Sequence, residues 1–281
     1  MRVQQGTCWL CAGAMALVAC AQANGDGRSG LSDAGDGGDA RGSAASDAGP
    51  APEDGGRPDA GATDASDQPD ATPASDGGDA SDGGSPQDLV QRLLAITVKC
   101  AVASNGKYST DDGKAATINI CKLNGAFFWR ADMDIDCDGQ QTTQCNKGTD
   151  PAYQSQTSFE QSDGKPLNAY ALPYVVVPLR STRFDYEAEN IRPGALAIVI
   201  FNGKLNYGAF GDEGPDNIIG EASYAMANSL GIDPDPSTGG EDTGVTYIVF
   251  TGAGAVVSPI ENHQAAVNLG ETLAQQLLQN N

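Results

Sequence analysis

The chain has 281 residues, seven cysteines and a formal net charge of −21, and these totals combine three segments of different composition. Residues 1–20 are apolar with a single charge, Arg2, whereas residues 21–86 hold 14 acidic residues, 3 basic residues and no aromatic side chain. Residues 87–281 hold 23 acidic and 12 basic residues, which is enough chain for one folded domain. Because nucleic acids and anionic lipids repel such an acidic surface, we expect no nucleic-acid binding and a cationic partner instead.

The first twenty residues have the layout of a secretory signal, because Arg2 precedes an apolar run that is too short for a stable membrane span. The tetrapeptide Leu17-Val18-Ala19-Cys20 resembles the lipobox of bacterial lipoproteins, which implies that Cys20 is acylated and becomes the new N-terminus. The alternative is an ordinary signal cleaved just after this cysteine, which is then lost. We expect an exported protein that is lipid-anchored at the bacterial outer membrane or cell surface, or secreted.

Residues 21–86 carry a net charge of −11 and a single large aliphatic residue, Leu31. Such a composition cannot bury enough apolar surface to offset the loss of chain entropy, so we predict a disordered acidic linker. The folded domain is expected at 87–281, as a monomer.

The domain contains four cysteines, which are Cys100, Cys121, Cys137 and Cys145. An even count in an exported chain predicts two disulfides, and the spacing leaves all three pairings open. Zinc is the competing interpretation, but the domain has no CxxC motif and the only histidine, His263, is far away in sequence. We therefore expect structural disulfides and no metal site.

Apolar runs bounded by Gly, Pro, Asn or Asp predict seven strands. They lie at 97–103, 117–123, 127–136, 172–179, 195–201, 204–211 and 245–251. Asn202-Gly203 tolerates positive φ at both central turn positions and predicts a tight hairpin. Helical spacing predicts helices at 87–96, 219–230 and 261–279. The fold class is therefore β-rich, all-β or α+β, with one barrel and flanking helices.

Four acidic residues recur at intervals of two along one expected strand, at Asp132, Asp134, Asp136 and Asp138. On a strand these carboxylates share one face and lie about 6.5–7 Å apart. An EF-hand loop starting at Asp134 fails because its twelfth position is Cys145 rather than Glu. Two interpretations stay open, which are a solvated strand edge and a row of acceptors for an extended polycation.

A second group lies at 210–224, where Asp212 ends an expected strand after one glycine and Glu221 opens an expected helix after another. Glycine lets the backbone approach a ligand closely, and the ends of elements are where sites are built. The structural alternative is that Glu221 complements the helix dipole and Asp212 supports a turn. A helix N-terminus lowers a carboxyl pKa, so Glu221 can act as a general acid only if burial or a neighbouring carboxylate outweighs the dipole.

Other catalytic patterns are missing from the sequence. A serine triad lacks its base, and no glycine loop follows the phosphate-binding pattern. Paired carboxylates and an acidic row remain, and they indicate glycosidic hydrolysis of a cationic glycan.

Four segments together resemble the chitosanases of glycoside hydrolase family 75, over about 90–275. They are Asp132 to Gly139, Ala171 to Pro178, Phe210 to Tyr224 and Val245 to Phe250. The resemblance implies endo-hydrolysis of β-1,4 links in chitosan, with inversion at the anomeric carbon and no cofactor. It also implies that Asp212 and Glu221 are the catalytic pair, and by analogy alone it suggests a six-stranded barrel of the double-psi kind.

Within that resemblance we assign Glu221 as the acid and Asp212 as the base. Three aspartates, Asp132, Asp134 and Asp136, would bind glucosamine ammonium groups, and three tyrosines are candidates for sugar stacking, which are Tyr174, Tyr207 and Tyr224. Two alternatives remain: a non-catalytic surface lipoprotein that binds cationic amino-sugar polymers, and a cell-wall enzyme that acts on peptidoglycan.

Overall fold

The computed structural model describes residues 85–281, so the predicted signal peptide, the acylation of Cys20 and the linker up to residue 84 lie outside the described residues. The first element is helix α1 (Pro86–Ile96), and the Ser85 side chain caps it by accepting a hydrogen bond from the Asp88 N–H. The first described helix therefore starts at Pro86, next to the boundary expected at residue 87.

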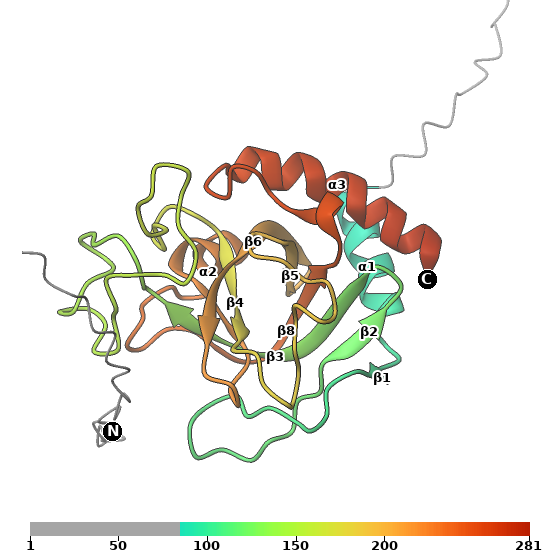
Figure 1. The fold of residues 1–281 in the computed structure, drawn as a ribbon, viewed down its shortest axis with the longest axis horizontal. Helices are drawn as coiled ribbons and strands as arrows, with labels where there is room; N and C mark the ends of the chain where they lie inside the picture. Colours follow the sequence, from blue (N-terminus) through green and yellow to red (C-terminus); the bar gives the residue numbers. More distant parts are fainter. Residues whose placement is uncertain (1–84) are drawn as a thin grey trace, which may run out of the picture. The chain divides into compact units, whose positions relative to one another are not determined.

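The core of the domain is a closed six-stranded barrel (Figure 1). Its strands follow the order β3-β7-β4-β6-β5-β8, and the pairing of β3 with β8 closes the ring. Their bounds are β3 (Ala126–Asp136), β4 (Tyr174–Pro178), β5 (Leu196–Phe201), β6 (Lys204–Gly214), β7 (Glu221–Ser223) and β8 (Glu241–Phe250). Two short strands, β1 (Ala101–Val102) and β2 (Cys121–Leu123), extend the sheet beside β3. The closed ring confirms the β-barrel prediction.

Successive side chains along each strand point alternately into the barrel and away from it, which gives one inner hydrophobic core and two outer hydrophobic cores. On β5, Ala197 and Val199 belong to the barrel interior, whereas Leu196, Ile198 and Ile200 belong to an outer cluster with residues of α1 and α3. Because both faces of this strand are buried, its sequence is a continuous apolar run rather than an alternating one.

Helices α1 and α3 (His263–Asn280) lie together on the outside of the barrel (Figure 1). A 3-10 turn (Ala253–Ala255) precedes α3, and the short helix α2 (Tyr224–Leu230) follows β7. Among residues 85–281, none of the helices combines the length and apolarity needed to cross a membrane.

The hairpin predicted at Asn202-Gly203 is confirmed, because both residues have positive φ and join β5 to β6 with Phe201 paired to Lys204. The helix predicted at 219–230 is wrong in its first part. Residues Glu221–Ser223 form β7 because they pair with β3 on one side and β4 on the other, and helical structure starts only at Tyr224.

The prediction of two disulfides is confirmed, and the pairs are Cys100–Cys121 and Cys137–Cys145. The second disulfide closes a loop directly after β3, and both of its cysteines are fully buried. They pack with Leu167, Tyr174 and Val176 in a small outer core between the long 137–173 connection and β4. This connection therefore covers the face of the sheet on which the acidic residues lie.

Candidate active site

The two predicted catalytic residues lie in one row across the barrel wall. Val176 of β4 is in register with Asp212 of β6 on one side and with Glu221 of β7 on the other. Glu221 is in register with Asp134 of β3. Residues in register point to the same face of a sheet, and the backbones of Asp212 and Glu221 are two strand spacings apart, about 9–10 Å.

A β-bulge places Asp212 on this outer face. The β4–β6 register runs from Val175↔Phe210 directly to Val176↔Asp212, so Gly211 is the extra residue. Without the bulge, Asp212 would share the face of Phe210, which belongs to the barrel interior. Gly211 has no room for a side chain, because an added Cβ would lie 2.7 Å from the Leu167 Cδ1 and from Tyr174 side-chain atoms.

Asp212 is 6% exposed and is held by donors from two segments. Its Oδ1 accepts hydrogen bonds from the Ser158 N–H at 2.7 Å and from the Glu213 N–H at 2.8 Å. Burial raises the pKa of Asp212, while the Ser158 hydroxyl and these two N–H groups lower it. The pKa of Asp212 stays raised overall, but the donors limit the rise and favour the ionised carboxylate, which is the form that a general base requires.

The environment of Glu221 differs, because the surrounding carboxylates add to the effect of burial. Burial of its carboxyl raises its pKa well above the ordinary glutamate value, and the nearby carboxylates of Asp136 and Asp134 raise it further. The concern about the helix dipole does not apply, because Glu221 lies on β7 and the N-cap of α2 is Ser223. An added Cβ on Gly214 of β6 would lie 3.5 Å from Glu221 Oε2, so the Glu221 side chain reaches across β4 towards the strand of Asp212.

Two further carboxylates, from Asp136 and Asp138, lie next to Asp212. One carboxylate oxygen each from Asp136, Asp138 and Asp212 lie within 4.8 Å of one another. Asp136 is 5% exposed, and burial followed by the Asp212 and Asp138 charges raises its pKa well above the usual range. Burial also raises the pKa of Asp138 to about 7. All three accept backbone hydrogen bonds, from the N–H groups of Asp138, Gln154 and Ser158 respectively.

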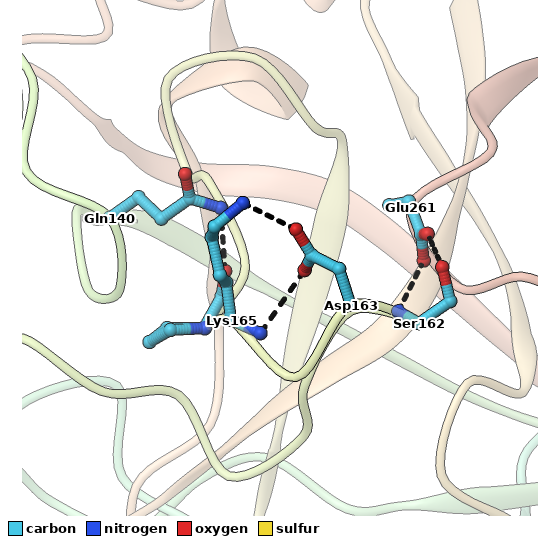
Figure 2. Close-up of polar contacts among 6 residues, drawn as sticks. Gln140, Ser162, Asp163, Lys165 and Glu261 are labelled. Carbon is cyan, nitrogen blue, oxygen red and sulfur yellow. Dashed lines mark hydrogen bonds and ion pairs between the residues drawn. The ribbon is translucent and has the colours of Figure 1, made fainter.

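The loop that carries Ser158 is fixed at its far end. Ser162 donates from its N–H and from its hydroxyl to the Glu261 carboxylate, and Lys165 pairs with Asp163 (Figure 2). Gln140 also donates from Nε2 to the Pro166 carbonyl at 2.8 Å (Figure 2). These contacts tie the loop both to the segment after β3 and to the segment before α3, so they keep Ser158 next to Asp212.

The three aspartates proposed for ammonium binding are not equivalent. Asp134 is exposed, whereas Asp132 and Asp136 are each 5% exposed. The structure therefore places the Asp134 carboxylate where a polymer can touch it, and places Asp132 and Asp136 below the surface.

The three tyrosines also differ. Tyr174 is fully buried, and Tyr207 lies beneath α3, where an added Cβ on Gly270 would be 2.1 Å from its ring. Tyr207 is 8% exposed, so both rings are less accessible to a sugar than that of Tyr224. Tyr224 is half-buried, pairs with the exposed Tyr170 at 5.2 Å between ring centroids, and borders a cavity of about 370 Å³. It is the one of the three that a sugar can reach.

Sequence reasoning did not identify Ser158, Gly211 or Val176 as parts of the site. Ser158 is 54 residues from Asp212 in the chain, and no local pattern marks it. Chemically, the assembled row offers a carboxyl group that holds its proton on one strand and a hydrogen-bonded carboxylate two strands away. That pair can donate a proton to one atom of a substrate and take a proton from a water on another side.

Comparisons with known proteins agree with this chemistry. A family model described as the fungal chitosanase of glycosyl hydrolase group 75 matches residues 133–277. Endo-chitosanase C of Aspergillus oryzae is 35% identical over 168 residues, which are 55% of this chain and 41% of that protein. Endo-chitosanase B of A. oryzae is 33% identical over 58% of this chain and 73% of that protein. An endo-chitosanase of Aspergillus fumigatus is 30% identical over 56% and 73%, respectively. The chain thus spans less than half the length of endo-chitosanase C.

Proposed function

The chain belongs to glycoside hydrolase family 75, and from that membership we propose that it is an endo-acting chitosanase that cleaves β-1,4 bonds between glucosamine units. One observation carries the proposal. Asp212 and Glu221 flank Val176 in one cross-strand row. Burial raises the pKa of both, but hydrogen-bond donors oppose the rise at Asp212, whereas neighbouring carboxylates add to it at Glu221.

We propose an inverting mechanism. Glu221 gives its proton to the glycosidic oxygen, and Asp212 removes a proton from a water that attacks the anomeric carbon from the opposite side. Inverting enzymes hold the two carboxyl groups about 6.5–9.5 Å apart so that the water fits between base and sugar. A separation of two strands, shortened by the reach of Glu221 towards β6, supports this range. The low exposure of Asp212 suits a base that meets one water rather than the polymer.

The charge of the domain supports a cationic substrate. Residues 87–281 carry a net charge of −11, and chitosan carries an ammonium group on most sugars at mildly acidic pH. Such a field attracts the polymer over about a Debye length. Among the side chains proposed for binding, we retain Asp134 for an ammonium group and Tyr224 for a sugar ring, because these two are accessible.

The decisive experiment digests defined chitosan and peptidoglycan side by side and follows the first anomer formed by NMR. We expect new reducing ends from the interior of chitosan, released as the inverted α-anomer. Binding of chitosan without new reducing ends would instead indicate the non-catalytic lipoprotein, and cleavage of peptidoglycan alone would indicate a cell-wall hydrolase. Release of the β-anomer would refute the inverting mechanism while leaving the chitosanase activity in place.

We also propose that the domain is exported and held by a lipid on Cys20. The two disulfides support an oxidising compartment, and the Leu17-Val18-Ala19-Cys20 segment supports acylation. Labelling with a radioactive fatty acid should mark the wild type and leave Cys20→Ala unmarked. An unlabelled wild type would refute the anchor.

A further inference from the structure

A second acidic cluster lies next to the catalytic row, at the positions of β3 that precede Asp136. Three carboxylate oxygens lie within 4.8 Å of one another, one each from Asp111, Asp132 and Asp134. Asp132 and Asp134 come from β3, while Asp111 comes from the connection between β1 and β2. That connection reaches the site because Ser109 pairs with Ile218, and the Ile219 N–H donates to the Ser109 carbonyl at 3.0 Å.

Asp132 is the unusual member of this cluster. Its side chain belongs to a residue that is 95% buried, and no donor among the described residues hydrogen-bonds to its Oδ1. Gly220 presses against this oxygen so closely that an added Cβ would lie 1.9 Å from it. A buried carboxylate oxygen without a donor is costly, and a bound cation is one of the few partners that removes the cost.

The spacing fits a metal ion better than a sugar ammonium. Ca²⁺ binds carboxylate oxygens at about 2.3–2.6 Å, so two of its ligands lie at most about 5 Å apart, as the oxygens of this cluster do. A glucosamine ammonium is attached to a polymer that cannot follow Asp132 below the surface, whereas a free ion can. Partly exposed Asp111 and exposed Asp134 leave room for the water ligands that Ca²⁺ usually retains.

The cluster differs in this respect from the one beside Asp212. There, Asp136, Asp138 and Asp212 each accept a backbone N–H, so their oxygens already have partners. We therefore propose that Asp111, Asp132 and Asp134 bind one divalent cation of the calcium class, which ties the β1–β2 connection to β3. This revises the expectation of no metal site, and it replaces the assignment of Asp134 to a sugar ammonium group.

The cation would also act on the reaction centre. Asp134 is in register with Glu221, and the segment 217–219 that leads into Glu221 is hydrogen-bonded to the β1–β2 connection at Ser109. A bound ion would therefore stabilise the strand beside Glu221 and the segment that precedes it. The proposal does not depend on the chitosanase activity, because binding is measured without substrate.

Terbium luminescence tests the site directly, with the chelator-treated full chain and Tb³⁺ as the probe. Tyr247 donates from its hydroxyl to the Asp132 main-chain carbonyl at 2.8 Å, so an excited tyrosine lies beside the bound ion. The acidic segment 21–86 contains no aromatic residue, so ions that bind along it lack a neighbouring sensitiser in sequence. We expect sensitised emission that saturates at one Tb³⁺ per chain and is displaced by Ca²⁺.

Single variants distinguish binding of Tb³⁺ at this site from nonspecific binding to other acidic residues. Asp111→Asn should weaken Tb³⁺ binding at least about tenfold, and the neighbouring exposed Asp112→Asn, which makes the same charge change, should bind as the wild type does. Asp132→Asn keeps the size of the buried side chain and should weaken binding similarly, with circular dichroism as a check of folding. Equal binding by the wild type and Asp111→Asn, or no sensitised emission from the wild type, would overturn the proposal. So would a loss of chitosan-oligomer binding in Asp111→Asn without any change in Tb³⁺ affinity.

Discussion

Asp212 and Glu221 lie on opposite sides of Val176, because this residue of β4 is in register with Asp212 on β6 and with Glu221 on β7. The two carboxylates are nine positions apart in sequence, yet β4, which lies between them in the barrel, comes from a segment more than thirty residues earlier. Their separation is therefore fixed by strand spacing rather than by the loop that joins them, and this makes the distance insensitive to changes in that loop.

Removing either carboxylate should abolish most activity. Asp212→Asn and Glu221→Gln keep the shape of each side chain but remove the base or the acid, and each should lower kcat about 10²–10⁴-fold. Asp216→Asn, an exposed residue of the same loop, is the matched control and should retain wild-type rates. Reducing-end release from chitosan measures all three variants. Full activity in both active-site variants would refute the assignment.

The barrel could be predicted from sequence because its strands are apolar runs bounded by turn residues, as at Asn202-Gly203. Strand β7 was missed because it has three residues, and its Ala222 also fits the helical spacing of the helix that follows. A strand this short is set by its neighbours β3 and β4, which local sequence does not reveal.

The resemblance to the chitosanase family pointed to the proposed catalytic pair, Asp212 and Glu221, but not to its geometry. The direction in which Asp212 points depends on the bulge at Gly211, which reverses the alternation that the sequence suggests. The Ser158 contact and the convergence of Asp111 on Asp132 depend on long connections without regular structure. These features are tertiary, and periodicity carries no signal for them.

Adding a methyl group at Gly211 should disrupt the site. The Cβ of Gly211→Ala would lie 2.7 Å from Tyr174 and Leu167, so the bulge must shift or the strands must separate. We expect a loss of about 1–3 kcal/mol in the free energy of unfolding and a larger relative loss of activity. Gly254→Ala is the control, because nothing lies within 4 Å of the added Cβ. Urea unfolding and chitosan hydrolysis measure the two effects, and an unaltered Gly211→Ala protein would show that the bulge is dispensable.

The Ser158 hydroxyl should control the acidic side of the pH profile. It lowers the pKa of Asp212, so Ser158→Ala should raise that pKa, while the backbone N–H remains. Because a general base works only when ionised, the acidic limb of kcat/KM should move to higher pH by about half a unit to one unit. The basic limb, which reports Glu221, should not move.

Ser162→Ala provides the comparison for this shift. Ser162 is on the same loop, but its hydroxyl contacts Glu261 rather than Asp212 (Figure 2). Its profile should keep the wild-type acidic limb. If both serine variants shift the limb equally, loop order rather than the hydrogen bond sets the pKa of Asp212.

Asp138 should make the protein less stable as the pH rises. Burial raises the pKa of Asp138 from the ordinary value of 3.8 to about 7, so the folded protein holds this proton more tightly than the unfolded chain does. The sign follows from proton binding: where the folded state binds more protons, the free energy of unfolding falls with increasing pH. The stabilisation is complete below about pH 4 and is lost as the pH rises through 7.

Asp138→Asn removes this dependence and can still accept the Gln154 N–H through its amide oxygen. At pH 8 the variant should therefore be more stable than the wild type, by on the order of 2 kcal/mol after allowance for solvent screening, and at pH 4 the two should match. Urea unfolding at both pH values measures the difference, with Asp216→Asn as an exposed control that should follow the wild type. A variant that is less stable than the wild type at pH 8 would mean that Asp138 is held ionised by a cation, which would extend metal binding to the cluster beside Asp212.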